Sequence, residues 1–105
     1  MTTYWLRNEL RTKSNAVVSD GDRPLKINVD GRIELIYCPD QHEYRITCDV
    51  VKSAKDLNTT IIAYAESWCG PTLEGEGYAK ELNITVMPFR SLFAYLKRKG
   101  IIFRE

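Results

Sequence analysis

The chain has 105 residues, of which 44% are hydrophobic and 28% are charged, a composition that is ordinary for one folded domain and excludes a disordered chain. Its 15 basic and 14 acidic residues give a net charge of +1, so the total charge does not steer the protein toward polyanions. Three cysteines without regular spacing exclude a disulfide scaffold, and the lack of a long apolar run predicts a cytoplasmic protein that does not span a membrane.

The first predicted element is a short amphipathic helix. Tyr4, Trp5, Leu6 and Leu10 recur at a spacing that puts apolar side chains on one side of a helix, and the pattern ends before Ser14. The apolar side of this helix needs a sheet to cover.

Alternating apolar residues then predict a three-stranded antiparallel meander. The alternation runs over 25–29, 33–37 and 44–50. Asp30-Gly31 is a strong signal for a tight hairpin turn between the first two strands. Pro39 and Asp40 predict a second turn, because proline cannot donate to a strand ladder.

The second half of the chain predicts strands that alternate with helices. Residues 59–65 are nearly all apolar and predict a strand covered on both faces, and 72–82 predict a helix. A short strand at 84–87 and a helix from Pro88 to Gly100 complete the chain. The order predicts one α/β (α+β) domain over 1–105, with a mixed sheet and helices packed on it.

Basic residues gather near both ends of the chain. They are Arg7, Arg11 and Lys13 near the start, and Arg90, Lys97, Arg98, Lys99 and Arg104 near the end. If the two ends share one face, Arg7, Arg11, Arg90, Lys97 and Arg98 would form a phosphate-binding surface for nucleic acid. The alternative interpretation is the ordinary solvated surface of helices.

The predicted meander also brings two acids and a lysine together. With a turn at 39–41, Glu34 lies near Thr47 and Asp49 lies next to Arg32, so both carboxylates share a face and Lys52 is within reach. Carboxylate oxygens are the ligands that Mg²⁺ prefers, and a nearby lysine can orient a water. The alternative is a solvent-facing strand with unremarkable charges.

A family resemblance is carried by the later elements. The residues concerned are 61–64, Tyr78-Ala79-Lys80-Glu81-Leu82-Asn83-Ile84, Leu92 and Leu96. Together with the order of elements, they resemble the later half of restriction-endonuclease-like domains of the Mrr and RecB type. The resemblance implies an Mg²⁺-dependent nuclease in which Glu34 is the first acid and Asp49 with Lys52 is the second pair. Lys52 follows Asp49 by three residues instead of two, which implies an altered or lost metal site.

The tetrapeptide Trp68-Cys69-Gly70-Pro71 after a hydrophobic strand resembles the start of the thioredoxin active site. Thr72 stands where the second cysteine belongs, so dithiol exchange is excluded. One-cysteine chemistry at Cys69 stays open, and it requires a lowered pKa of this thiol.

Two hypotheses about function therefore lead. The first is a nucleic-acid-associated domain with a restriction-endonuclease-like core and a degenerate active site. The second is a small non-catalytic interaction protein, a regulator or inhibitor that docks on a protein partner or self-associates, which suits the near-zero net charge and the many aromatic residues. His42, the only histidine, lies in a predicted turn beside acids, and no other residue lies at a spacing that suggests a catalytic site with it.

Overall fold

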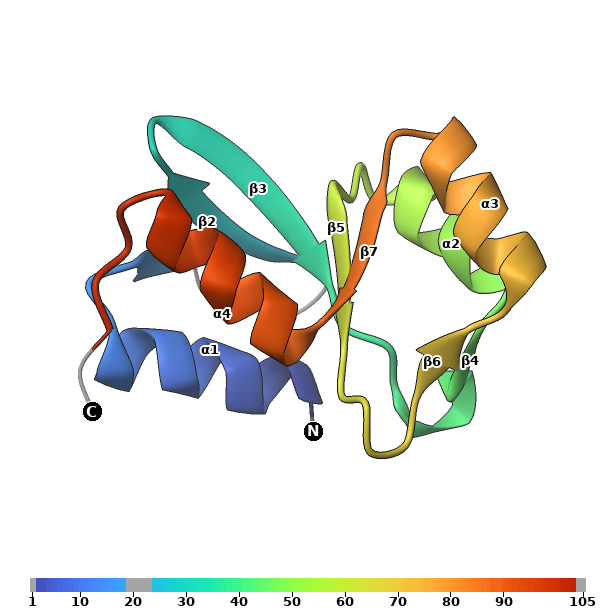
Figure 1. Ribbon diagram of the computed structural model, residues 1–105, viewed down its shortest axis with the longest axis horizontal. Helices are drawn as coiled ribbons and strands as arrows, with labels where there is room; N and C mark the ends of the chain where they lie inside the picture. Colours follow the sequence, from blue (N-terminus) through green and yellow to red (C-terminus); the bar gives the residue numbers. More distant parts are fainter. Residues whose placement is uncertain (1, 19–23, 104–105) are drawn as a thin grey trace.

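A computed structural model describes residues 2–18 and 24–103, and Arg104 lies outside this part. Figure 1 shows a twisted mixed sheet with helices on both faces. The helices are α1 (Thr2–Lys13), α2 (Cys48–Asp56), α3 (Leu73–Glu81) and α4 (Phe89–Arg98). The strands are β1 (Val17–Val18), β2 (Leu25–Val29), β3 (Arg32–Tyr37), β4 (Arg45–Ile46), β5 (Ile61–Tyr64), β6 (Gly70–Pro71) and β7 (Thr85–Pro88), and a 3₁₀ turn, η1, spans Gln41–Glu43. The predicted α/β class is confirmed.

The main sheet has the order β1-β2-β3-β5-β7. The pairs β1/β2 and β2/β3 are antiparallel, and the pairs β3/β5 and β5/β7 are parallel. The turn between β2 and β3 has positive φ angles at both Asp30 (53°) and Gly31 (79°), as a type I′ hairpin requires. The predicted hairpin is therefore confirmed, and so is the strand expected within 59–65, which both hydrophobic clusters cover.

Two hydrophobic clusters lie on opposite faces of this sheet. On one face, the buried leucines of α1 and α4 pack on alternate residues of the strands, including Ile27 and Ile36. On the other face, α2 and α3 cover Tyr37 and Ile62. The helices therefore form two layers, α1 with α4 and α2 with α3, with the sheet between them.

The predicted third strand of the meander is wrong. Of the residues 44–50, only Arg45 and Ile46 form a strand, and it pairs with β6 in a separate two-stranded parallel sheet. The side chain of Thr47 then caps the N-terminus of α2 by accepting from the Val50 amide at 3.4 Å. Val50, Val51 and Ala54 are the buried residues of α2 and have the spacing of one side of a helix, whereas Cys48, which continued the alternation, is exposed. The antiparallel meander of the structure is β1-β2-β3.

The small β4/β6 sheet packs tightly against the N-terminus of α3. Thr72 accepts from the Gly75 amide at 2.9 Å, and its own amide donates to the Ile46 carbonyl at 3.2 Å. A Cβ atom at Gly75 would overlap with that carbonyl oxygen, whereas one at Gly77 would meet nothing within 4 Å. Gly75 thus permits the close approach of α3 to β4. Among the described helices, none has the length and apolar character needed to cross a bilayer.

Candidate functional site

Glu34 lies in β3 on the face of the sheet that α1 and α4 cover. Its side chain is only 5% exposed and accepts hydrogen bonds from the Thr60 hydroxyl at 2.6 Å and from the Tyr95 hydroxyl at 2.7 Å. The hydrogen bond to Glu34 raises the pKa of Tyr95, and burial raises it further. Glu34 thereby joins β3 to α4 and to the start of β5, and the structure gives it a structural role.

Asp49 and Lys52 lie elsewhere. Both are exposed residues of α2, which packs on the opposite face of the sheet from Glu34. The expectations that Asp49 lies beside Arg32 and that Glu34 lies near Thr47 are wrong, because the second neighbour of β3 is β5, and Thr47 and Asp49 belong to the cap and first turn of α2. The structure therefore does not bring the expected pair of Mg²⁺ ligands together.

The basic residues from the two ends of the chain do share one layer. Arg7, Arg11 and Lys13 lie on α1, and Arg90, Lys97 and Arg98 lie on α4. The two helices cover the same face of the sheet, and Figure 1 shows them side by side. Trp5 of α1 contacts α4 directly, with ring centroids 5.2 Å from Phe89 and 6.2 Å from Phe93.

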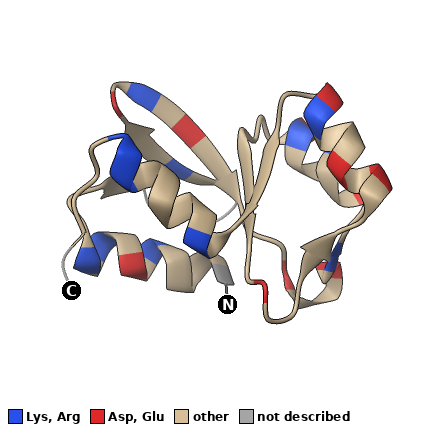
Figure 2. Cartoon of the chain, viewed as in Figure 1, with Lys and Arg blue, Asp and Glu red and all other residues tan. Residues whose placement is uncertain are grey.

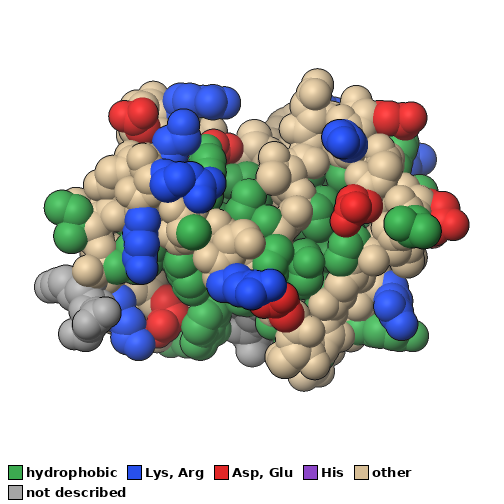
Figure 3. Space-filling view, viewed as in Figure 1, with side chains coloured by type: hydrophobic (Ala, Val, Ile, Leu, Met, Phe, Trp, Pro, Cys, Tyr) green, Lys and Arg blue, Asp and Glu red, His purple; other side chains and the backbone are tan. Residues whose placement is uncertain are grey.

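The charge of the two helical layers differs in sign. The sequences of α1 and α4 contain six basic residues and one acidic residue, whereas those of α2 and α3 contain three basic and five acidic residues. Figure 2 shows the basic positions along α1 and α4, and Figure 3 shows Lys and Arg side chains gathered over the half of the molecule that contains α4. The near-zero total charge thus conceals a basic layer and an acidic layer.

Contacts of the basic side chains leave most of this charge at the surface. Arg90 pairs with Glu66 at 2.9 Å and Lys13 pairs with Glu9 at 3.2 Å, and Arg90 and Lys13 are mostly exposed. Exposed ion pairs of this kind contribute about 0–1 kcal/mol, so a stronger anion can displace them. Lys97 lies over the ring of Phe103, 5.6 Å from its centroid. Arg11, Lys97, Arg98 and Lys99 are all exposed.

Exposed aromatic rings border the basic layer at the start of α1. Tyr4 is 57% exposed and lies under the Arg7 guanidinium, 5.5 Å from the ring centroid. Trp5 is 44% exposed even though its ring is held against Phe89 and Phe93. Stacking on nucleic-acid bases uses rings of this kind, exposed on one side and fixed on the other, beside cationic side chains. The rings of Tyr95 and Phe103, by contrast, lie under lysine side chains.

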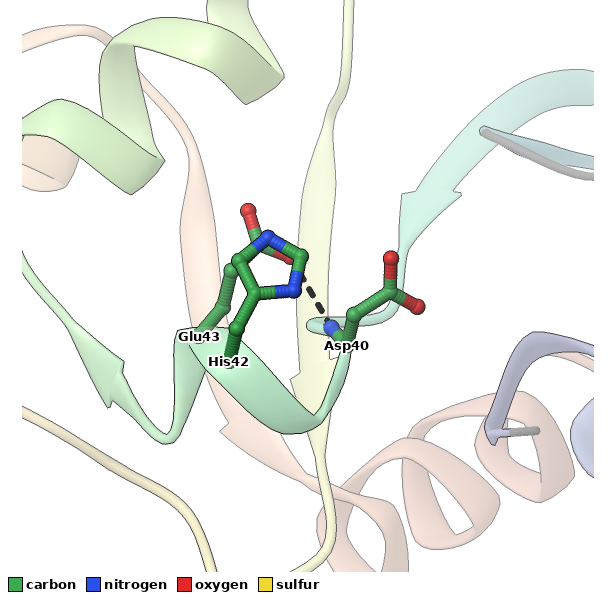
Figure 4. A group of neighbouring side chains, drawn as sticks. All are labelled: Asp40, His42 and Glu43. Carbon is green, nitrogen blue, oxygen red and sulfur yellow. Dashed lines mark hydrogen bonds between the residues drawn. The ribbon is translucent and has the colours of Figure 1, made fainter.

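A second group of polar side chains lies in η1 and its N-cap residue, beyond the carboxyl end of β3. One ligand atom from each of Asp40, His42 and Glu43 lies within 4.8 Å of the other two, and Figure 4 shows the three side chains projecting from one short turn. The Glu43 carboxylate accepts from the Asp40 amide at 2.9 Å and from the Tyr37 hydroxyl at 2.7 Å. Sequence analysis found only a turn here, although the spacing Asp-x-His-Glu already offered three ligands within four residues.

Cys69 does not have the environment that one-cysteine chemistry requires. Burial raises the pKa of the Cys69 thiol, and the thiol donates weakly to the Glu43 carbonyl at 3.6 Å. Cys69 precedes β6 and is not at a helix N-terminus, because α3 begins only at Leu73. A raised pKa lowers the thiolate fraction, so this environment disfavours an activated thiol at Cys69.

Comparisons with models of protein families, with curated proteins and with solved structures find no match for this chain.

Proposed function

We propose that the protein is a nucleic-acid-binding domain that holds the phosphate backbone on the surface of α1 and α4. The observation that carries the proposal is the excess of six basic residues over one acidic residue in a helical layer formed by the two ends of the chain. Lys and Arg side chains on one surface neutralise phosphates and release condensed counterions, which supplies most of the free energy of non-specific binding.

Binding without cutting fits the arrangement of the acids. The resemblance to restriction-endonuclease-like domains assigns catalysis to Glu34, Asp49 and Lys52. Glu34 is hydrogen-bonded within the fold, and Asp49 and Lys52 lie on α2 across the sheet from it. This arrangement favours a restriction-endonuclease-like domain that has lost its metal site. Loss of the metal site would leave phosphate binding as the retained activity.

The test is fluorescence anisotropy with labelled single-stranded DNA, duplex DNA and RNA over a range of salt concentrations. The variant Lys97→Gln/Arg98→Gln removes two charges from α4, and the control Lys52→Gln/Lys55→Gln removes two charges from α2. Both variants have the same net charge, so they differ only in where the charge is lost. We expect the α4 variant to reduce the slope of log K against log salt by about 2 and the affinity by about tenfold or more, and the α2 variant to change either much less.

Equal effects of the two variants would refute a binding surface on α4, and the absence of binding to all three nucleic acids would refute the proposal. Incubation with Mg²⁺ or Mn²⁺ tests the catalytic alternative in the same samples. Cleavage that disappears in Asp49→Ala would restore the nuclease hypothesis.

A protein partner is the second candidate, and exposed apolar residues near the small β4/β6 sheet favour it. Leu73, at the start of α3, is 87% exposed, and Tyr44 and Trp68 are 58% and 37% exposed. Light scattering after size exclusion tests self-association through this end of the molecule. A dimer that Leu73→Ser dissociates would support an interaction protein, and a monomer at high concentration would argue against self-association.

A further inference from the structure

We propose that Asp40, His42 and Glu43 form a binding site for a borderline divalent ion of the Zn²⁺, Co²⁺ or Ni²⁺ type. The three ligand atoms already lie within 4.8 Å of one another. Ligands that are about 2.1 Å from a shared ion lie roughly 3–3.5 Å apart. Small rotations of side chains on one turn would therefore close the site around an ion.

The geometry of the turn is fixed before any ion binds. The Glu43 amide donates to the Asp40 carbonyl at 2.8 Å, and the Asp40 amide donates to the Glu43 carboxylate at 2.9 Å. On the other side, the Gly70 amide donates to the Tyr44 carbonyl at 3.1 Å, just before β4 pairs with β6. The backbone that carries the ligands is thus tied at both ends.

A buried hydroxyl orients one of the ligands. Tyr37 is 3% exposed and donates to Oε2 of Glu43 at 2.7 Å. A carboxylate has about four lone-pair sites, so an oxygen that accepts a hydrogen bond can still bind a metal. Hydrogen bonds of this kind from outside the ligand set hold metal-binding carboxylates in many sites. Tyr37 is accordingly a positioning residue.

The donor set selects the class of ion. Imidazole nitrogen binds Zn²⁺, Co²⁺, Ni²⁺ and related ions, whereas Mg²⁺ and Ca²⁺ prefer all-oxygen sites. Three protein ligands leave at least one coordination position for water or a further ligand. His42 is exposed and the two carboxyl residues are half-buried, so the open position faces solvent.

The test uses untagged protein in a Cys48→Ser background, because Cys48 is an exposed thiol that can bind the same ions. Zn²⁺ titration by calorimetry gives the affinity, and the visible absorption of bound Co²⁺ reports its ligands. His42 is the only histidine, so its imidazole signals in NMR spectra assign the site directly. We expect one ion per chain and a shift of these signals on binding.

Three variants of the site and one control variant complete the experiment. His42→Gln and Glu43→Gln should each weaken Zn²⁺ binding about tenfold or more, and Tyr37→Phe should weaken it about tenfold while keeping the ligands. Gln41→Ala, a change to an exposed neighbour on the same turn, should leave the affinity unchanged. No binding at millimolar Zn²⁺, or binding that His42→Gln leaves unaltered, would overturn the proposal. Because His42→Gln alters an exposed side chain, we expect the variant to fold, which circular dichroism checks.

Discussion

Gly75→Ala measures how closely α3 packs against β4. Gly75 is buried in the first turn of α3, and an added methyl group would overlap with the backbone carbonyl oxygen of Ile46. A backbone carbonyl cannot rotate away as the end of a flexible side chain can. The N-terminus of α3 would therefore move outward and lose the hydrogen bond from the Thr72 amide to Ile46.

The expected size follows from two opposing terms. A methyl group without room in a packed region costs about 1–3 kcal/mol, and replacement of glycine by alanine inside a helix stabilises it by about 1 kcal/mol. Because the obstruction at Gly75 is backbone, the cost lies toward the upper end, and the net loss of stability is about 2 kcal/mol. Gly77 is exposed in the same helix with open space around it, so Gly77→Ala should stabilise by about 0.5–1 kcal/mol.

Urea unfolding followed by circular dichroism measures both variants. The two free energies of unfolding should differ by about 3 kcal/mol with opposite signs relative to the unaltered protein, while the m-value stays constant. Values for the two variants that agree within about 0.5 kcal/mol would show that α3 does not approach β4 closely, and the small β4/β6 sheet would then lose its main support.

Three further predictions concern a pH dependence, a helix cap and a ring. The raised pKa values of Tyr95 and Tyr64 mean that the folded state holds these protons more tightly than the unfolded state, so stability is complete below about pH 10 and falls as the pH rises further. Tyr95→Phe should make this alkaline loss of stability smaller, which unfolding midpoints between pH 8 and 11 would reveal. Thr47→Ala removes the cap of α2 and should cost about 1 kcal/mol in urea unfolding. If bases stack on Trp5, single-stranded DNA should quench its fluorescence in a Trp68→Phe protein, and no quenching despite binding would exclude stacking at Trp5.

Local patterns were sufficient to predict most of the elements. The Asp30-Gly31 turn needs two positive φ angles that these residues adopt readily, so the hairpin follows from adjacent residues alone. The helix at the start, the buried strand at 61–64 and the last helix each have a clear apolar period over their own length. None of these elements depends on a distant partner for its identity.

The segment around Thr47 shows where such patterns fail. Ile46, Cys48 and Val50 alternate as in a strand, but Val50, Val51 and Ala54 also lie on one side of a helix. The N-cap of Thr47 and the position of Asp49 in the first turn favour the helix, because both satisfy or complement its free amides. The two-residue strand β4 depends on β6, which lies 25 residues later in the sequence, and no local signal reports that pairing. The predicted Mg²⁺ site was wrong for the same reason, because Asp49 and Lys52 lie on α2, on the face of the sheet opposite Glu34.

The net charge of the chain was also a poor guide to the charge of each face, because the basic and acidic layers lie far apart. The basic layer and the acidic layer lie on opposite faces of one sheet, and their outer surfaces are about 30 Å apart, because two helix layers of about 10 Å each and the sheet lie between them. The Debye length in 0.1 M salt is about 10 Å. A ligand approaching α1 and α4 therefore feels their six basic residues while the five acids of α2 and α3 are largely screened from it. Each face acts on partners as a separate surface, and the sum over the whole chain describes neither.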